Sequence, residues 1–277
     1  MLHFKRFASV TQKITLAILG SFLMLFLLVH AGINLCLLRA DGGEWFRAAA
    51  HFMGTNYIVK VFEVVLFAAL LLHILLGVLL QWQNWRARPV RYKVPSKSAT
   101  APGSKFMIYT GILVAIFLVI HLMNFYFVKM NWVEGKYLVE IEDVQKADPA
   151  YVQEHMEKVL ELFQSEEPTG SAPFKEVATG ITKADLIEAF GPGFTAYEPD
   201  FYSMAQGLFN NTAYLVLYLV LILALGIHLV HAFPSALHTL GLNGPCYDRP
   251  IKCIGAVYAV IVVLMFWAVA IGMNILY

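Results

Sequence analysis

The sequence predicts an all-α integral membrane protein with five transmembrane helices, four of which form a bundle, and a small extracytoplasmic helical insertion. The chain of 277 residues is 59% hydrophobic and only 14% charged, and its mean hydropathy of +0.65 lies far from that of soluble domains. Five apolar runs are long enough to cross a bilayer as helices, because a helix satisfies its own backbone hydrogen bonds in lipid. The charged residues gather in the connections between these runs.

The predicted spans are bounded by changes in polarity. They comprise residues 12–38, 57–85, 106–130, 206–233 and 253–276. The first run is too long for a signal peptide, and no small-residue cleavage site follows it. We therefore divide the chain into residues 1–130 with three spans, the insertion 131–205, and residues 206–277 with the last two spans.

Charge assigns the connections to the two sides of the membrane. Lys5, Arg6 and Lys13 make the N-terminus basic, and residues 86–105 carry six basic residues and no acidic one. Both segments are therefore expected in the cytoplasm. The segment 131–203, with 15 of the 19 acidic residues, and the C-terminus are expected outside. The expected location is the cytoplasmic (inner) cell membrane.

The insertion has its own helix signals. Asp148 and Pro149 are typical of a helix start and precede an amphipathic stretch that ends near residue 164. Thr182 and Asp185 form a capping-box pattern for a second helix that stops at residues 191–192. The insertion is either a solvated cap without a catalytic role or a lid over an outer site.

Four of the five spans carry a histidine, and a histidine inside a bilayer is costly and usually functional. The first and third spans run outward and place His30 and His121 about eight and nine residues from their outer ends. The second and fourth spans run inward and place His73 and His228 in the inner half. The sequence thus predicts two pairs at two depths, His30 with His121 and His73 with His228.

Two facing pairs of histidines are the ligands that two six-coordinate haem irons need. His30 and His121 would bind the outer iron, and His73 and His228 the inner one. The chain has no CxxCH sequence, so both haems are expected to be of b type. His231 is the alternative to His228 and could instead bond a haem propionate. The competing interpretation is a set of unrelated histidines bonded to backbone carbonyls or lining a proton path.

Glu63 is the other ionisable residue well inside a span, about six residues from the outer end of the second one. Quinol oxidation releases two protons, so it needs a proton acceptor beside the electron acceptor. Glu63 fits that role, and Lys60 one turn earlier would anchor a quinol oxygen. The alternative is an interfacial Glu–Lys pair that extends toward the headgroups.

Several short motifs resemble the di-haem, five-span cytochrome b membrane-anchor subunit of succinate dehydrogenases and quinol:fumarate reductases. Gly20 precedes His30 by ten residues, and His73 is followed by Gln83-Asn84-Trp85-Arg86-Ala87-Arg88-Pro89 and Tyr92. His121 and the stretch from Gly226 to Ala236, running on to Thr239-Leu240-Gly241, complete the resemblance. The long insertion departs from the family, whose outer loops are short.

The resemblance implies that His30, His73, His121 and His228 are the axial ligands of two haem b groups, paired first with third and second with fourth. It also implies menaquinone as the lipid substrate. The expected partners are a flavoprotein with bound FAD and an iron–sulfur protein on the cytoplasmic face, which carry the dicarboxylate chemistry. The whole complex can form a dimer, and no nucleic acid is expected as a partner.

The sequence is also compatible with two other functions. The first is a haem-bundle anchor for a different quinone-linked oxidoreductase, such as a hydrogenase or a formate dehydrogenase. The second is a non-redox, proton-coupled transporter whose histidines relay protons. The partner that co-purifies with the chain and its absorption spectrum distinguish the three functions.

Overall fold

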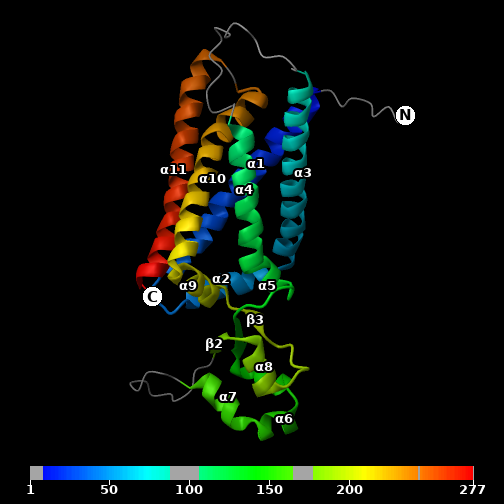
Figure 1. The fold of residues 1–277 in the computed structure, drawn as a ribbon, viewed down its shortest axis with the longest axis vertical. Helices are drawn as coiled ribbons and strands as arrows, with labels where there is room; N and C mark the ends of the chain where they lie inside the picture. Colours follow the sequence, from blue (N-terminus) through cyan, green and yellow to red (C-terminus); the bar gives the residue numbers. More distant parts are fainter. Residues whose placement is uncertain (1–8, 88–105, 165–176, 243, 277) are drawn as a thin grey trace, which may run out of the picture. The chain divides into compact units, whose positions relative to one another are not determined.

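The protein, represented by a computed structural model, is an all-α multi-pass membrane protein (Figure 1). The structure describes residues 9–87, 106–164, 177–242 and 244–276. Among them are five helices long and apolar enough to cross a membrane, in agreement with the predicted fold class. Lys5, Arg6 and most of the predicted basic inner loop, with Pro89 and Tyr92, lie outside the described residues.

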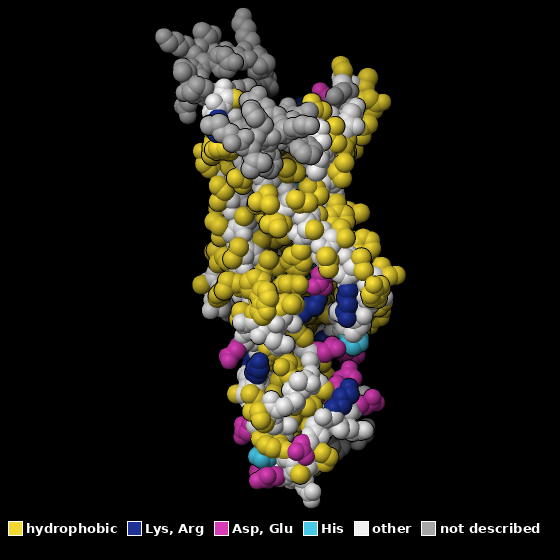
Figure 2. Space-filling model, turned by 90° about the vertical axis from the view of Figure 1, so that its right-hand side faces the viewer, with side chains coloured by type: hydrophobic (Ala, Val, Ile, Leu, Met, Phe, Trp, Pro, Cys, Tyr) yellow, Lys and Arg dark blue, Asp and Glu magenta, His cyan; other side chains and the backbone are white. Residues whose placement is uncertain are grey.

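The chain forms two compact units, residues 1–117 with 216–272 and residues 118–215 with 273–277. The larger unit contains long helices that run alongside one another (Figure 1), and much of the face of this unit seen in Figure 2 is covered by hydrophobic side chains. Its elements are α1 (Ser9–Asn34), η1 (Leu35–Leu38), α2 (Glu44–Thr55), α3 (Tyr57–Ala87) and most of α4 (Met107–His121), α10 (Thr212–Thr239) and α11 (Pro245–Leu276).

Asparagine caps fix where two spans begin. The side-chain oxygen of Asn56 accepts hydrogen bonds from the backbone N–H groups of Ile58 and Val59, at 2.9 and 3.3 Å. Asn211 caps α10 in the same way through Ala213 and Tyr214, at 3.0 and 3.3 Å. These bonds satisfy N–H groups that a helix start leaves without an intrahelical partner.

The fourth span differs from its predicted range of 206–233. A separate helix, α9 (Phe201–Asn210), ends just before Asn211, so the span starts at Thr212. The helix then continues through Pro234 to Thr239. Proline removes one backbone hydrogen bond, yet a helix buried in lipid has no water to compete for the rest of its ladder. His231 therefore lies in the interior of α10, well before its end.

Helix α11 contains no histidine, but its side chains form hydrogen bonds to two other helices of the larger unit. The Tyr258 hydroxyl donates to the Met24 carbonyl of α1 at 2.6 Å, and the Trp267 indole N–H donates to the Leu219 carbonyl of α10 at 3.1 Å. Gly226 lets α10 approach α11, because a Cβ at this position would overlap Cγ2 of Val263. Small residues at helix contacts are typical of packing in membranes.

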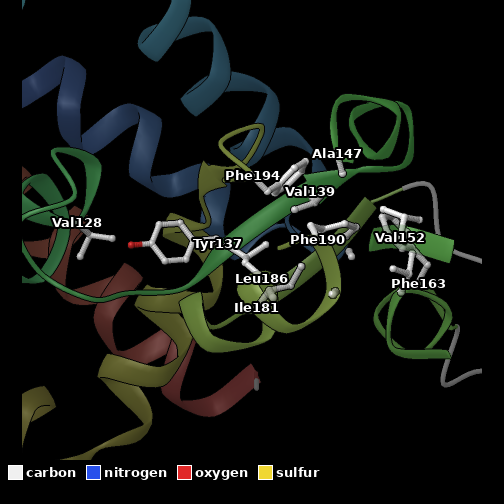
Figure 3. Packing of buried hydrophobic residues seen from close by; sticks show 13 residues of the cluster. Val128, Tyr137, Val139, Ala147, Val152, Phe163, Ile181, Leu186, Phe190 and Phe194 are labelled. Carbon is white, nitrogen blue, oxygen red and sulfur yellow. The ribbon is translucent and has the colours of Figure 1, made fainter. Parts of the chain in front are cut away.

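The smaller unit contains a three-stranded antiparallel sheet with the strand order β2-β1-β3. Its buried apolar cluster includes Tyr137 and Val139 of β1 and Leu186 and Phe190 of α8 (Figure 3). In chain order its elements are η3 (Leu122–Tyr126), α5 (Phe127–Lys129), β1 (Tyr137–Glu140), η4 (Ile141–Lys146), α6 (Pro149–Glu154), α7 (Met156–Phe163), β2 (Val177–Ile181), α8 (Lys183–Phe190), β3 (Glu198–Pro199) and α9.

The helix starts predicted in the insertion are confirmed. Asp148 accepts a hydrogen bond from Ala150 N at 2.9 Å, and Thr182 and Asp185 form a complete capping box. The Thr182 hydroxyl, donating to Asp185, holds the pKa of that carboxyl below its ordinary value. The first helix is not continuous, however, because it breaks at His155 into α6 and α7. The sheet was not foreseen, since its strands have only four, five and two residues.

The contact between α10 and α11 predicts the effect of a small substitution. Gly226→Ala should lower the free energy of unfolding by about 1–3 kcal/mol, because the added methyl group meets Val263 in a packed contact. Unfolding in mixed micelles followed by circular dichroism measures this change. Gly77→Ala is the matched control, since nothing lies within 4 Å of a Cβ there. Equal stability of the two variants would contradict the packing assignment, and Val263→Ala should restore the stability of Gly226→Ala.

Candidate functional site

The histidines predicted from the sequence divide between the two units. His30 lies on α1, His73 on α3, and His228 and His231 on α10, all within the larger unit. His121 is the last residue of α4 and belongs to the smaller unit. All five side chains are half-buried.

His73 packs directly against the backbone of α1. A Cβ atom placed on Gly20 would lie 3.4 Å from Cε1 of the His73 ring, so the imidazole is close to the backbone of α1 and a large side chain at position 20 would meet it. The ring also interacts with the backbone of Leu16, one turn earlier on α1. Nδ1 of His73 is buried and has no hydrogen-bond partner among the described residues. A buried nitrogen of this kind is costly unless a ligand satisfies it.

His228 packs against α4. Its Nδ1 lies 3.2 Å from the hydroxyl oxygen of Thr110, and a Cβ placed on Gly111 would lie 3.7 Å from its Cε1. His228 also interacts electrostatically with His73 and with His231. The larger unit thus brings the predicted inner pair near each other, with a helix backbone supporting each ring.

The contact with Gly20 separates two levels within the larger unit. It puts the His73 ring beside Gly20 on α1. His30 lies ten residues farther along the same helix, a rise of about 15 Å. His30 and the pair formed by His73 and His228 therefore occupy different depths of the bundle, with His30 nearer the end at which α1 leads into α2.

Aromatic rings and an amide surround His30. The ring of Phe26 stacks on it at 5.3 Å between centroids, and Phe266 of α11 approaches it at 5.7 Å. The Asn34 amide donates to the backbone carbonyl of His30 at 2.8 Å and lies 3.4 Å from its Nδ1. These neighbours restrict the orientation of the ring without enclosing it.

His121 lies where α4 changes its winding. The five residues after it, Leu122–Tyr126, form a turn of π-helix, and the ring of Phe125 lies 5.2 Å from that of His121. Turns of π-helix inside α-helices are rare and occur frequently at functional sites. No local pattern in the sequence indicates this turn, because it depends on a shift in backbone hydrogen bonding.

The remaining predicted residues lie at the two ends of the larger unit. Nδ1 of His231 is buried and has no hydrogen-bond partner among the described residues, so the ring is available for a polar group near His228. At the start of α3, Lys60 is exposed and Glu63 is half-buried. Glu63 lies ten residues before His73 on the same helix, about 15 Å away along the axis.

The paired histidines supply the donor type that a haem iron uses. In the described part of the chain, no group of three or more His, Cys, Asp or Glu residues could hold a metal ion. A haem iron needs only two protein ligands, since the porphyrin supplies the other four nitrogens. Paired imidazoles in an apolar bundle have the chemistry that meets this need.

An exposed apolar groove on the larger unit is separate from the histidines. The groove has a volume of about 560 Å³ and lies between α3 and α4, where Leu75, Leu79 and Trp82 face Ile112. With 3.6 residues per turn, these α3 positions fall on the side of the helix opposite His73. The groove therefore does not connect to the histidines.

Sequence reasoning missed Thr110, Gly111 and Phe266, which contact the histidines from neighbouring helices. A threonine in an otherwise apolar span was the available signal for Thr110. Phe266 carries no such signal, because aromatic residues are common in every span of this chain. Comparisons with family models, with curated proteins and with solved structures find no match to this chain.

The contact between Gly20 and His73 yields a prediction. Gly20→Leu should push the His73 ring away from α1. If His73 binds haem as the sequence predicts, the haem content should fall from two per chain toward one. Gly32→Leu, at an exposed position of the same helix where nothing lies within 4 Å of a Cβ, is the matched control and should keep both haems. The haem-to-protein ratio of the purified chain measures the effect. An unchanged ratio in Gly20→Leu would show that the ring does not need this space.

Proposed function

We propose that the chain is the membrane-anchor cytochrome b of a succinate dehydrogenase or quinol:fumarate reductase complex. It transfers electrons between menaquinone or menaquinol and an iron–sulfur subunit through two bis-histidine haems b. The observation that carries the proposal is the arrangement of His73 and His228, two rings supported by Gly20 and Thr110 on neighbouring helices. The proximity that their electrostatic interaction implies supports a shared ligand between them.

Each histidine would have one role. His73 and His228 would bind the inner haem iron, and His30 and His121 the outer one. The pairing of His30 with His121 is supported by their equal predicted depth in the membrane and by the family resemblance. Bound haem supplies one-electron transfer, and the chain sets its position and surroundings. Because the levels of His30 and His73 differ by about 15 Å along α1, the two haems together carry electrons across much of the membrane.

The outer end of the larger unit would hold the quinone. Glu63 accepts a proton as quinol is oxidised, and Lys60 anchors a quinol oxygen. The half-buried carboxyl of Glu63 near the start of α3 supports this role, since a proton acceptor is needed beside the electron acceptor. Electrons would then enter at the outer haem and leave through the inner one.

The partners would bind at the cytoplasmic end. The basic segments at the N-terminus and at residues 86–105 suit the docking of a flavoprotein with FAD and of an iron–sulfur protein. These partners carry the succinate–fumarate chemistry, so the chain is the quinone-reactive subunit of an oxidoreductase. Its location would be the inner membrane, with the N-terminus in the cytoplasm and the insertion and C-terminus outside.

Removing one ligand of the outer pair tests the pairing. His30→Ala and His121→Ala should each abolish the outer haem and leave the inner one, because a bis-histidine iron loses half of its protein ligands. Redox difference spectra with a potentiometric titration distinguish the two haems. Loss of the inner haem alone in either variant would overturn the assignment. His51→Ala, outside the predicted spans, is the control and should retain both haems.

Removing the carboxyl group at the outer end tests the quinol site. Glu63→Gln should leave both haem spectra unchanged and slow menaquinol oxidation by about 10²–10⁴-fold, the range for loss of a general base. Stopped-flow reduction of the haems by a menaquinol analogue measures the rate. Wild-type turnover would instead assign Glu63 to an interfacial pair with Lys60.

The partner that co-purifies with a tagged chain identifies the complex. A flavoprotein and an iron–sulfur protein with succinate or fumarate activity would support the proposal. A hydrogenase or formate dehydrogenase subunit would replace it with the related anchor function. If the chain binds two haems and co-purifies with a hydrogenase or formate dehydrogenase subunit, the haem assignment stands. Only the reaction catalysed by the cytoplasmic partner then differs.

A further inference from the structure

We infer that Thr110 is a positioning residue for His228, which it fixes in the tautomer that carries its proton on Nδ1. This leaves the lone pair of Nε2 for the inner haem iron. The inference rests on the proposed function, in which His228 is an axial ligand. It concerns a residue on α4, a helix whose own histidine, His121, belongs to the other pair.

The hydroxyl group of Thr110 has one proton, and the helix competes for it. Its oxygen lies 3.1 Å from the carbonyl of Met107 and 3.4 Å from that of Phe106, which immediately precedes the helix. A threonine hydroxyl inside a helix commonly donates to a carbonyl three or four residues earlier. With its proton used there, the Thr110 oxygen can only accept at its third contact, which is Nδ1 of His228 at 3.2 Å.

His228 must therefore be the donor in that bond. A neutral imidazole has one N–H and one lone pair, so an N–H at Nδ1 places the lone pair on Nε2. Metal-binding histidines use this arrangement, in which the second nitrogen donates to an outer group that fixes both tautomer and ring orientation. The branched side chain of Thr110 has few rotamers, which holds the acceptor in place.

The two histidines of the inner pair differ in this respect. Nδ1 of His228 has a hydroxyl acceptor, whereas Nδ1 of His73 is buried without a hydrogen-bond partner among the described residues. A hydrogen bond from Nδ1–H makes the ring a more basic ligand, and a more basic ligand favours the ferric over the ferrous iron. Thr110 should accordingly hold the reduction potential of the inner haem lower than an apolar residue would.

Thr110→Val and Thr110→Ser test the inference in the full-length protein. Valine keeps the shape and removes the acceptor, whereas serine keeps a hydroxyl. In Thr110→Val the inner haem should favour the ferrous state about tenfold more, the lower end of the range for loss of an outer-shell bond. That change is about 59 mV for a one-electron couple. Thr110→Ser should return the potential toward the wild-type value.

Potentiometric titration and low-temperature electron paramagnetic resonance of the ferric haems supply the readouts. The outer haem is the internal control, and its potential should not change. Thr55→Val is the matched substitution, because the Thr55 hydroxyl donates to the His51 carbonyl of its own helix at 2.8 Å. Equal inner-haem potentials in wild-type, Thr110→Val and Thr110→Ser proteins would overturn the inference. Loss of the inner haem in both Thr110 variants would also overturn it, in favour of a packing role.

A measurement on the haem-free chain separates this inference from the proposed function. Nitrogen-15 resonances of labelled histidine distinguish the two tautomers, and His228→Gln identifies the His228 signals. Protonation at Nδ1 in the wild-type chain, lost in Thr110→Val, supports the role of Thr110. Protonation at Nε2 in the wild-type chain contradicts it. A chain that binds no haem at all would instead refute the proposed function.

Discussion

The lack of water inside the bilayer is the constraint on which this structure depends. Backbone groups there must bond to each other, which requires helices, and polar side chains must find partners inside the bundle. An imidazole has two ring nitrogens to satisfy, and its environment decides which one binds a ligand. Thr110 is a hydrogen-bond partner for Nδ1 of His228. Nδ1 of His73, in contrast, is buried and has no hydrogen-bond partner among the described residues. Helix packing thus gives the two neighbouring rings different hydrogen-bond partners, and these partners would influence the haem proposed between them.

Glycine residues let the histidine rings lie close to the backbones of neighbouring helices. Gly20 and Gly111 carry no side chain where the rings of His73 and His228 lie. Helix α11 contributes no histidine, yet Tyr258 ties it to α1 and Trp267 ties it to α10. The fifth span therefore has a structural role, and the other four spans carry the histidines of the proposed haem sites.

Features that depend on periodicity, charge and capping could be predicted from the sequence, whereas features that depend on contacts between distant segments could not. The five spans and the caps at Asp148 and Thr182 could be foreseen because each depends on neighbouring residues. The predicted range of the fourth span started too early, because residues up to Asn210 form the separate helix α9 and Asn211 caps the start of α10. Short strands, the π-helical turn after His121 and the partner of His228 depend on tertiary contacts, which a local pattern does not contain.

The haem content of the purified chain tests the central claim most directly. A dithionite-reduced minus oxidised spectrum, combined with a pyridine haemochrome assay and a protein determination, gives the type and number of haems. We predict a b-type α band and two haems per chain, released by acid–acetone extraction because no thioether holds them. A chain without an α band, or with a single haem at full loading, would contradict the bis-histidine, two-haem assignment.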